Sequence, residues 1–160
     1  MAFELRVRVP SWVARGGSAR LNGKVLDGFA APGGYLVLDR TWRDGDRIEL
    51  SLPMALSSWP MPDDPSLQAI SYGPLVLAAR MGNAGLGPDV LRAEPTKPRK
   101  IPEYKGQGLP TPSLTGHAPW VRGEDGRPLA FRTTAGERRE LVPLYQILDE
   151  RYSVYFKVPV

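Results

Sequence analysis

The chain has 160 residues, no cysteine, one histidine and a formal net charge of +4. The lack of cysteine excludes a thiol nucleophile, a disulfide and a cysteine-ligated zinc site within these 160 residues, and the single histidine excludes a histidine-based metal cluster. Gly and Pro number 17 each, which, alongside regular apolar alternation, favours short strands joined by many turns.

The first predicted elements are amphipathic strands. Phe3–Val9 alternates apolar and charged residues as far as Pro10 and predicts a half-buried strand. Ala19–Leu21 and Lys24–Leu26 flank the dipeptide Asn22-Gly23, the strongest short signal for a tight hairpin, because both central residues of such a turn need a positive φ.

The stretch Gly34–Met54 contains two further alternating runs, Tyr35–Leu38 and Arg47–Leu52, on either side of a turn centred on Gly45. In the second run, alternate apolar residues share one face, as a half-buried strand requires. The pattern predicts a β-hairpin packed on a core.

The next predicted elements are a loop over Ser57–Pro65 and a strand over Leu67–Tyr72. After Gly73-Pro74, the run Leu75–Ala79 is almost wholly apolar and predicts a central strand that is buried on both faces.

Residues 82–119 hold six Gly and seven Pro and show little periodicity, apart from a weak helical pattern at Asp89–Glu94. A segment this long without regular structure is uncommon inside a compact domain and predicts a linker or a surface excursion. Strand patterns return at 120–122, 129–133, 141–147 and 152–158, with a turn at 124–126.

Together these elements predict an all-β fold, an antiparallel β-sandwich of jelly-roll type. The alternative is a pair of small sandwiches joined by the Gly/Pro-rich segment. The expected division is a β-sandwich domain over 1–81, a linker or excursion over 82–119, and residues 120–160 as closing strands of the same sandwich or a second small β domain.

Five groups of residues, in order along the chain, resemble one known family. They are Leu5 to Trp12 with its Val-Pro-Ser-Trp ending, Leu21 to Lys24, the Gly34–Met54 run with Trp42 and Gly45-Asp46, Tyr72 to Ala78 with its Gly-Pro step, and Pro143-Leu144-Tyr145 followed by Asp149 to Tyr152 and Tyr155. The chain resembles the C-terminal, non-catalytic part of glycoside hydrolase family 127, the β-L-arabinofuranosidase-type enzymes.

The resemblance implies that the chemistry is performed elsewhere. Enzymes of this family place a helical barrel ahead of these strands, and that barrel carries the catalytic glutamate, the cysteine nucleophile and the zinc. The resemblance therefore implies no catalytic residue, no metal site and no cofactor in these residues, with zinc in the missing barrel. The strand pattern directly after Met1 suggests a fragment of a longer protein.

Carboxylate pairs are the obvious candidates for glycoside hydrolysis, which needs two carboxyl groups about 5–9.5 Å apart. The candidates are Asp44 with Asp46, Asp63 with Asp64, and Asp149 with Glu150. The first pair flanks a turn glycine, the second lies between prolines, and the third could pair with Arg151, so structural roles are expected for all three. The single histidine, His117, is interpreted as an ordinary loop residue.

The four tryptophans are candidates for stacking on sugar rings. Trp12 and Trp42 lie in predicted strand motifs and are expected to anchor the core. Trp59 is predicted in a loop and Trp120 at the start of a strand, and each could contact a sugar or a neighbouring domain. For Trp59 local packing is a further alternative, and a domain contact is favoured because its loop is rich in Met and Pro.

The leading hypothesis is an accessory β-sandwich region that scaffolds the missing catalytic barrel and forms a dimer interface. The runner-up is an autonomous carbohydrate-binding module, and a free-standing enzyme is a weaker third. The basic residues are scattered, so no nucleic-acid partner is expected. There is no apolar run of membrane-spanning length and no signal-peptide pattern, so a soluble chain of unknown compartment is expected.

Overall fold

The structure is a computed structural model that describes residues 1–84, 86 and 120–158. Its regular elements are antiparallel strands and one short 3₁₀ turn within these described residues, so the predicted all-β class is confirmed. The chain forms two compact units, Met1–Ser57 with Tyr72–Pro74, and Ser58–Ser71 with Leu75–Val160.

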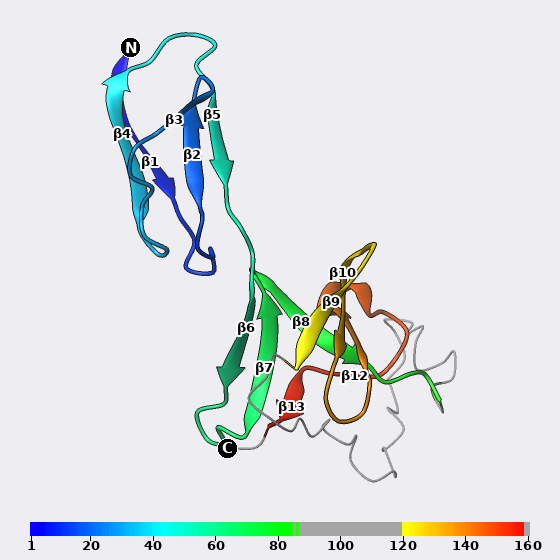
Figure 1. Cartoon of the computed structure of the whole chain (residues 1–160). Helices are drawn as coiled ribbons and strands as arrows, with labels where there is room; N and C mark the ends of the chain where they lie inside the picture. The colour runs from blue at the N-terminus through cyan, green and yellow to red at the C-terminus, as the bar shows by residue number, and fades with distance from the viewer. Residues whose placement is uncertain (85, 87–119, 159–160) are drawn as a thin grey trace, which may run out of the picture. The chain divides into compact units, whose positions relative to one another are not determined.

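The first unit contains two small sheets. Strand β1 (Ala2–Arg8) pairs with β4 (Tyr35–Thr41), and β2 (Ser18–Leu21) lies between β3 (Lys24–Val25) and β5 (Ile48–Ser51), as Figure 1 shows. Residues from both sheets form one core, because the inward positions of each strand are apolar. Its buried members are Val9, Val13, Ala19 and Leu36, with Trp12, Phe29 and Leu52 packed against them.

The hairpin predicted within Gly34–Met54 is wrong, although both of its strands exist. β4 pairs with β1 over seven residues, from Ala2 opposite Thr41 to Arg8 opposite Tyr35, while β5 pairs with β2. The Asp44-Gly45 turn, where Gly45 has a φ of 83°, therefore leads the chain from one sheet to the other. A turn signal identifies a change of direction but does not identify the strand that becomes the partner.

The hairpin predicted at Asn22-Gly23 is confirmed. Both residues have positive φ, 51° and 78°, and they connect β2 to β3 with Leu21 opposite Lys24. These two dihedrals match the twist of antiparallel strands, so the register of the hairpin follows from the local sequence.

The second unit is built on one curled sheet with the order β13-β7-β8-β11-β10-β9, in which β6 also pairs with β7 and β12 with β8. The strands are β6 (Leu56–Pro60), β7 (Leu67–Tyr72), β8 (Leu75–Arg80), β9 (Val121–Glu124), β10 (Arg127–Thr133), β11 (Glu140–Pro143), β12 (Tyr152–Ser153) and β13 (Tyr155–Lys157), with the 3₁₀ turn η1 (Leu144–Gln146) after β11. The described strands on both sides of residues 82–119 therefore share one sheet.

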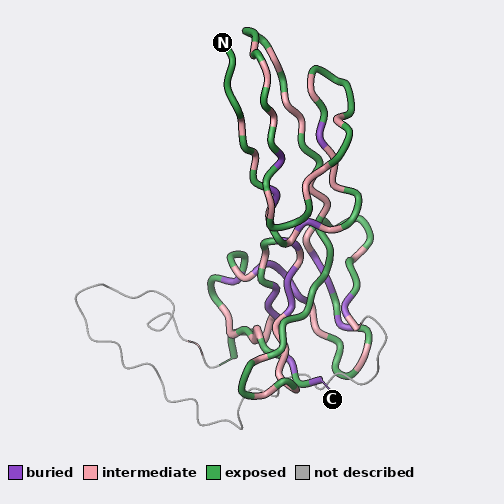
Figure 2. Tube along the Cα trace, turned by 90° about the vertical axis from the view of Figure 1, so that its left-hand side faces the viewer, coloured by how far each residue is buried: buried purple, intermediate pink, exposed green. Residues whose placement is uncertain are grey.

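The predicted burial of the apolar run Leu75–Ala79 is confirmed for its last three residues, whereas Val76 is 45% exposed. Leu77, Ala78 and Ala79 of β8 are 0% exposed. β8 lies between β7 and β11 in the sheet, and Figure 2 marks the buried residues of the chain in purple along the Cα trace. The burial of three successive residues explains why the apolar residues of β8 do not alternate with polar ones.

One other prediction is wrong, and three more lie wholly or mostly outside the described residues. The expected loop Ser57–Pro65 begins as strand, because β6 pairs along β7 and tolerates Pro60 at its end. His117 and the weak helix Asp89–Glu94 lie outside the described residues, as does most of the predicted linker 82–119.

Candidate functional site

Trp59 lies on β6 and is 58% exposed. Its indole Nε1 donates a hydrogen bond of 2.9 Å to the Oγ atom of Ser71 on β7. The ring is therefore held in place at its polar edge while much of its surface faces solvent, which is the arrangement that a sugar or another domain could use.

Trp120 precedes β9 and is partly buried against the core of the second unit. Its ring centroid is 5.6 Å from that of the fully buried Phe156, at an interplanar angle of 53°. Its carbonyl oxygen accepts a hydrogen bond of 2.7 Å from the amide of Thr134. The described contacts of Trp120 are thus packing contacts, and no ring contact joins it to Trp59 within the described residues.

The other two tryptophans also have structural partners. Trp12 packs on the core of the first unit, as predicted. Trp42 lies further out, with its ring stacked on Phe3 at 5.5 Å and the Arg40 guanidinium 5.1 Å from its centroid. Its Nε1 donates to the carbonyl oxygen of Phe3 at 3.0 Å, so Trp42 closes the end of the β1–β4 sheet.

The candidate carboxylates stabilise turns and loops. Asp46 accepts hydrogen bonds from the Arg43 amide at 2.9 Å and the Asn22 side chain at 2.8 Å, and these two bonds, with the nearby Arg40, lower its pKa. The hydroxyl and amide of Ser66 lower the pKa of Asp64 in the same way. A carboxylate stabilised in its charged form is a poor proton donor at neutral pH.

Glu150 differs because it joins distant parts of the second unit. It forms an ion pair with Arg80 of β8 and accepts a hydrogen bond of 3.2 Å from the amide of Gly82. The described ion pair of Glu150 is thus with Arg80, which is 70 residues away, whereas the sequence suggested a local pairing with Arg151. Asp149 and Glu150 line a cavity of about 420 Å³, but the Glu150 carboxylate is engaged by Arg80, so this pair does not offer two free carboxyl groups.

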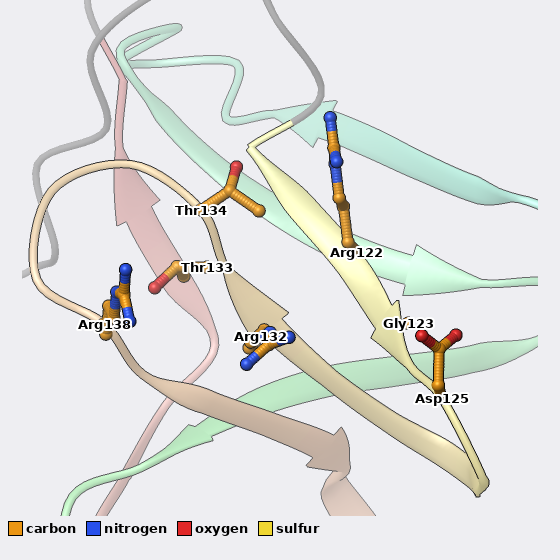
Figure 3. Close-up of a pocket in the computed structure, with 7 residues that line it drawn as sticks. All are labelled: Arg122, Gly123, Asp125, Arg132, Thr133, Thr134 and Arg138. Atoms are coloured by element: carbon orange, nitrogen blue, oxygen red, sulfur yellow. The ribbon is translucent and has the colours of Figure 1, made fainter.

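The structure adds a candidate site that the sequence did not reveal. A cavity of about 480 Å³ opens beside the β9–β10 hairpin (Figure 3). It is lined by Arg122, Gly123, Asp125, Arg132, Thr133, Thr134 and Arg138. The three arginines are spread along the sequence and resemble ordinary solvated strand residues, so only the pairing of β9 with β10 and the path of the next loop bring them together.

Strand register explains the position of the two central arginines. Arg132 of β10 is directly opposite Arg122 of β9, so both lie on the solvent face of this strand pair. The neighbouring pair, Thr133 opposite Val121, is buried on the core face. Arg138 comes from the loop that follows β10, and Figure 3 shows the three side chains arranged around the same hollow.

Hydrogen bonds to one buried threonine fix that loop. The Oγ1 atom of Thr133 donates to the carbonyl oxygen of Glu137 and accepts from the amide of Arg139, both at 2.8 Å. The Thr133 amide also donates to the carbonyl oxygen of Arg139 at 3.0 Å. The residues on both sides of Arg138 are thus tied to β10.

Neither a cluster of metal-ligating side chains nor a membrane-crossing helix is found in the part of the chain that the structure describes. No three His, Asp or Glu side chains there are grouped so that they could hold a metal ion. No helix among the same residues is long and apolar enough to cross a membrane.

Two family models match the chain in succession. Residues 1–54 match the family described as Beta-L-arabinofuranosidase, GH127 middle domain. Residues 57–158 match DUF4986, described as a domain of unknown function. No curated protein matches the chain.

Several solved structures share the fold of the whole chain. One is a glycoside hydrolase, with 17% identity and a TM-score of 0.61, and another is a GH127 beta-arabinofuranosidase, with 16% identity and a TM-score of 0.62. A third is a GH127 beta-L-arabinofuranosidase from Geobacillus stearothermophilus T6, with 19% identity and a TM-score of 0.59. Each match covers 99% of this chain but only 28%, 28% and 27% of the respective structures. At these identities the likeness establishes the fold.

Proposed function

We propose that this chain, which belongs to the DUF4986 family through residues 57–158 and matches the GH127 middle-domain model over residues 1–54, is a non-catalytic accessory region of a glycoside hydrolase. The main support for this proposal is that the two family models match successive stretches of the chain. The whole chain also has the fold of a little over a quarter of each GH127 structure. The proposed parent acts on β-L-arabinofuranosides, the substrate class after which a similar GH127 structure and the matching family are named.

In this proposal the region supports a catalytic barrel that lies elsewhere in the parent protein. Hydrolysis, the cysteine nucleophile and the zinc belong to that barrel, and the absence of cysteine from all 160 residues supports this assignment. The role of the present chain is to pack against the barrel and to contribute to a dimer interface of the parent.

An activity assay separates this proposal from an independent enzyme. The purified 160-residue chain should release no arabinose from an aryl β-L-arabinofuranoside, whereas the parent protein should. Release by the chain alone, abolished by an Asp or Glu substitution within it, would contradict the proposal.

A truncation tests the scaffold role. The parent without this region should unfold at a lower temperature and lose activity on heating sooner than the intact parent. Sedimentation of the two forms tests the dimer role, since the truncated form should be monomeric. An unchanged melting temperature would contradict the scaffold role. A truncated form that still sedimented as a dimer would contradict the dimer role.

The exposed ring of Trp59 favours a second candidate, a carbohydrate-binding module. Binding of an oligosaccharide on this ring should quench tryptophan fluorescence, and Trp59→Ala should abolish the quenching. Trp120→Phe, which keeps an aromatic ring against Phe156, is the matched control and should retain it. Absence of quenching across neutral and acidic oligosaccharides would eliminate this candidate.

A further inference from the structure

Two arginines occupy directly opposite positions on β9 and β10 without a described counter-charge. Arg122 and Arg132 are directly opposite in the antiparallel register. Like charges in this position repel each other and destabilise the strand pair. Neither guanidinium has an ion pair within the described residues, and neither has Arg138.

The neighbouring carboxylates are already engaged with other arginines. Arg127 binds Glu124 at 2.8 Å and Glu140 at 2.7 Å, and Arg139 binds Glu137 at 2.5 Å. The same hairpin and loop therefore contain arginines with carboxylate partners and arginines without them, and those without partners are the ones that line the cavity.

We propose that this cavity binds an acidic sugar, whose oxyanion is bound by the arginine side chains that line it. Three guanidinium groups against the single carboxylate of Asp125 give the lining a net positive charge. Guanidinium binds a carboxylate or a phosphate through two parallel hydrogen bonds, so either group can supply the oxyanion. The bound anion would also relieve the repulsion across the hairpin.

The rest of the lining favours a ligand rich in hydroxyl groups. No aromatic or aliphatic side chain belongs to the described lining, which otherwise consists of Gly123, Asp125, Thr134 and the buried Thr133, whose hydroxyl is already bonded to the loop. The Asp125 carboxylate is an acceptor for sugar hydroxyls. The cavity of about 480 Å³ lies within the size range of small-molecule sites, and a strand pair and an anchored loop hold it open.

This inference goes beyond the accessory role, because a scaffold needs no ligand site of its own. It is also independent of Trp59, since the proposed contacts are polar and come from β9, β10 and the loop after β10.

The ligand class is tested by following the amide resonances of the 160-residue chain during titration with D-glucuronate, D-glucose 6-phosphate, D-glucose and inorganic phosphate. At least one acidic sugar should bind about tenfold or more tightly than glucose and than phosphate, with shifts in β9 and β10. Binding of glucuronate alone identifies a carboxylate site, and binding of glucose 6-phosphate alone identifies a phosphate site. Equal binding of inorganic phosphate, an adventitious ion only, or equal binding of glucose would overturn the proposal.

Three variants assign the binding to the cavity. Arg132→Gln should weaken binding of the acidic sugar about tenfold or more, because it removes a charge-assisted hydrogen bond. Arg122→Gln should also weaken binding, since the Arg122 guanidinium is a second donor that lines the cavity. Arg20→Gln, which removes an equal charge from β2, should bind as the unmodified chain does. Undiminished binding by both cavity variants, each shown to be folded by its amide spectrum, would refute the assignment.

Discussion

At the scale of single residues, the side chain of Asp46 organises the turn between β4 and β5. It accepts hydrogen bonds from the Arg43 amide and the Asn22 side chain and lies 3.3 Å from an Arg40 nitrogen. Asn22 in turn accepts a hydrogen bond of 2.8 Å from the amide of Arg47. One carboxylate thereby connects this turn to the β2–β3 hairpin.

The lowered pKa of Asp46 predicts a pH-dependent contribution to stability. Because the folded-state pKa lies below the unfolded-state value, the contribution is complete above the unfolded pKa of about 3.9 and is lost as the pH falls through the folded pKa. Asp46→Asn should therefore lower the melting temperature at pH 7, with a difference that shrinks on acidification.

The measurement is thermal unfolding from pH 2 to pH 7, with Asp44→Asn as the matched control in the same turn. Asp44 makes none of the described hydrogen bonds of Asp46, so its substitution should change the melting temperature little at any pH. A constant difference between the Asp46 variant and the unmodified chain across this range would show that the charge makes no contribution.

At the scale of elements, β8 contains three fully buried residues in succession, Leu77, Ala78 and Ala79. Leu77 is 0% exposed, whereas its neighbour Val76 is 45% exposed. Leu77→Ala removes buried atoms and leaves a cavity, so the free energy of unfolding should fall by about 2–5 kcal/mol. Val76→Ala should cost much less, and urea denaturation of the two variants compares them directly; equal losses would contradict this burial pattern.

Strand positions could be predicted from the sequence more readily than strand partners. The burial of Leu77 follows from an unbroken apolar run, and the Asn22-Gly23 hairpin follows from two residues that accept positive φ. In contrast, β4 and β5 pair with β1 and β2 because the two sheets together enclose the core. That choice depends on contacts distant in sequence, which local alternation does not encode.

The candidate site shows the same limit. Trp59 could be singled out by residue type, but its position on β6 depends on pairing with β7. The arginine-lined cavity could not be anticipated, because an arginine on an exposed strand face ordinarily improves solvation. The arginine lining of the cavity depends on the β9–β10 register, which places Arg122 opposite Arg132.

At the scale of the whole molecule, each compact unit has its own core. Val9 belongs to the core of the first unit, while Ala78 and Val142 belong to that of the second. Val9→Ala should destabilise the first unit by about 2 kcal/mol through lost burial and incomplete collapse.

Native-state hydrogen exchange can locate that loss. Amides of β1 and β4 should lose protection in Val9→Ala, while amides of β8 and β11 should retain theirs. Leu77→Ala is the reciprocal control and should produce the opposite distribution. Equal loss of protection in all four strands would show that the two units unfold as one.

The turn at Gly73 has a consequence for how the two families can be separated. Its amide donates a hydrogen bond of 3.0 Å to the carbonyl oxygen of Ala55, and a Cβ there would lie 2.5 Å from Cγ of Met54. The turn thus closes the first unit, although it belongs to the stretch matched by the second family. A chimera that joined residues 1–56 to another C-terminal domain would lose this closure. A transplantable first unit must therefore carry a replacement for a turn that lies outside the stretch matched by the first family model.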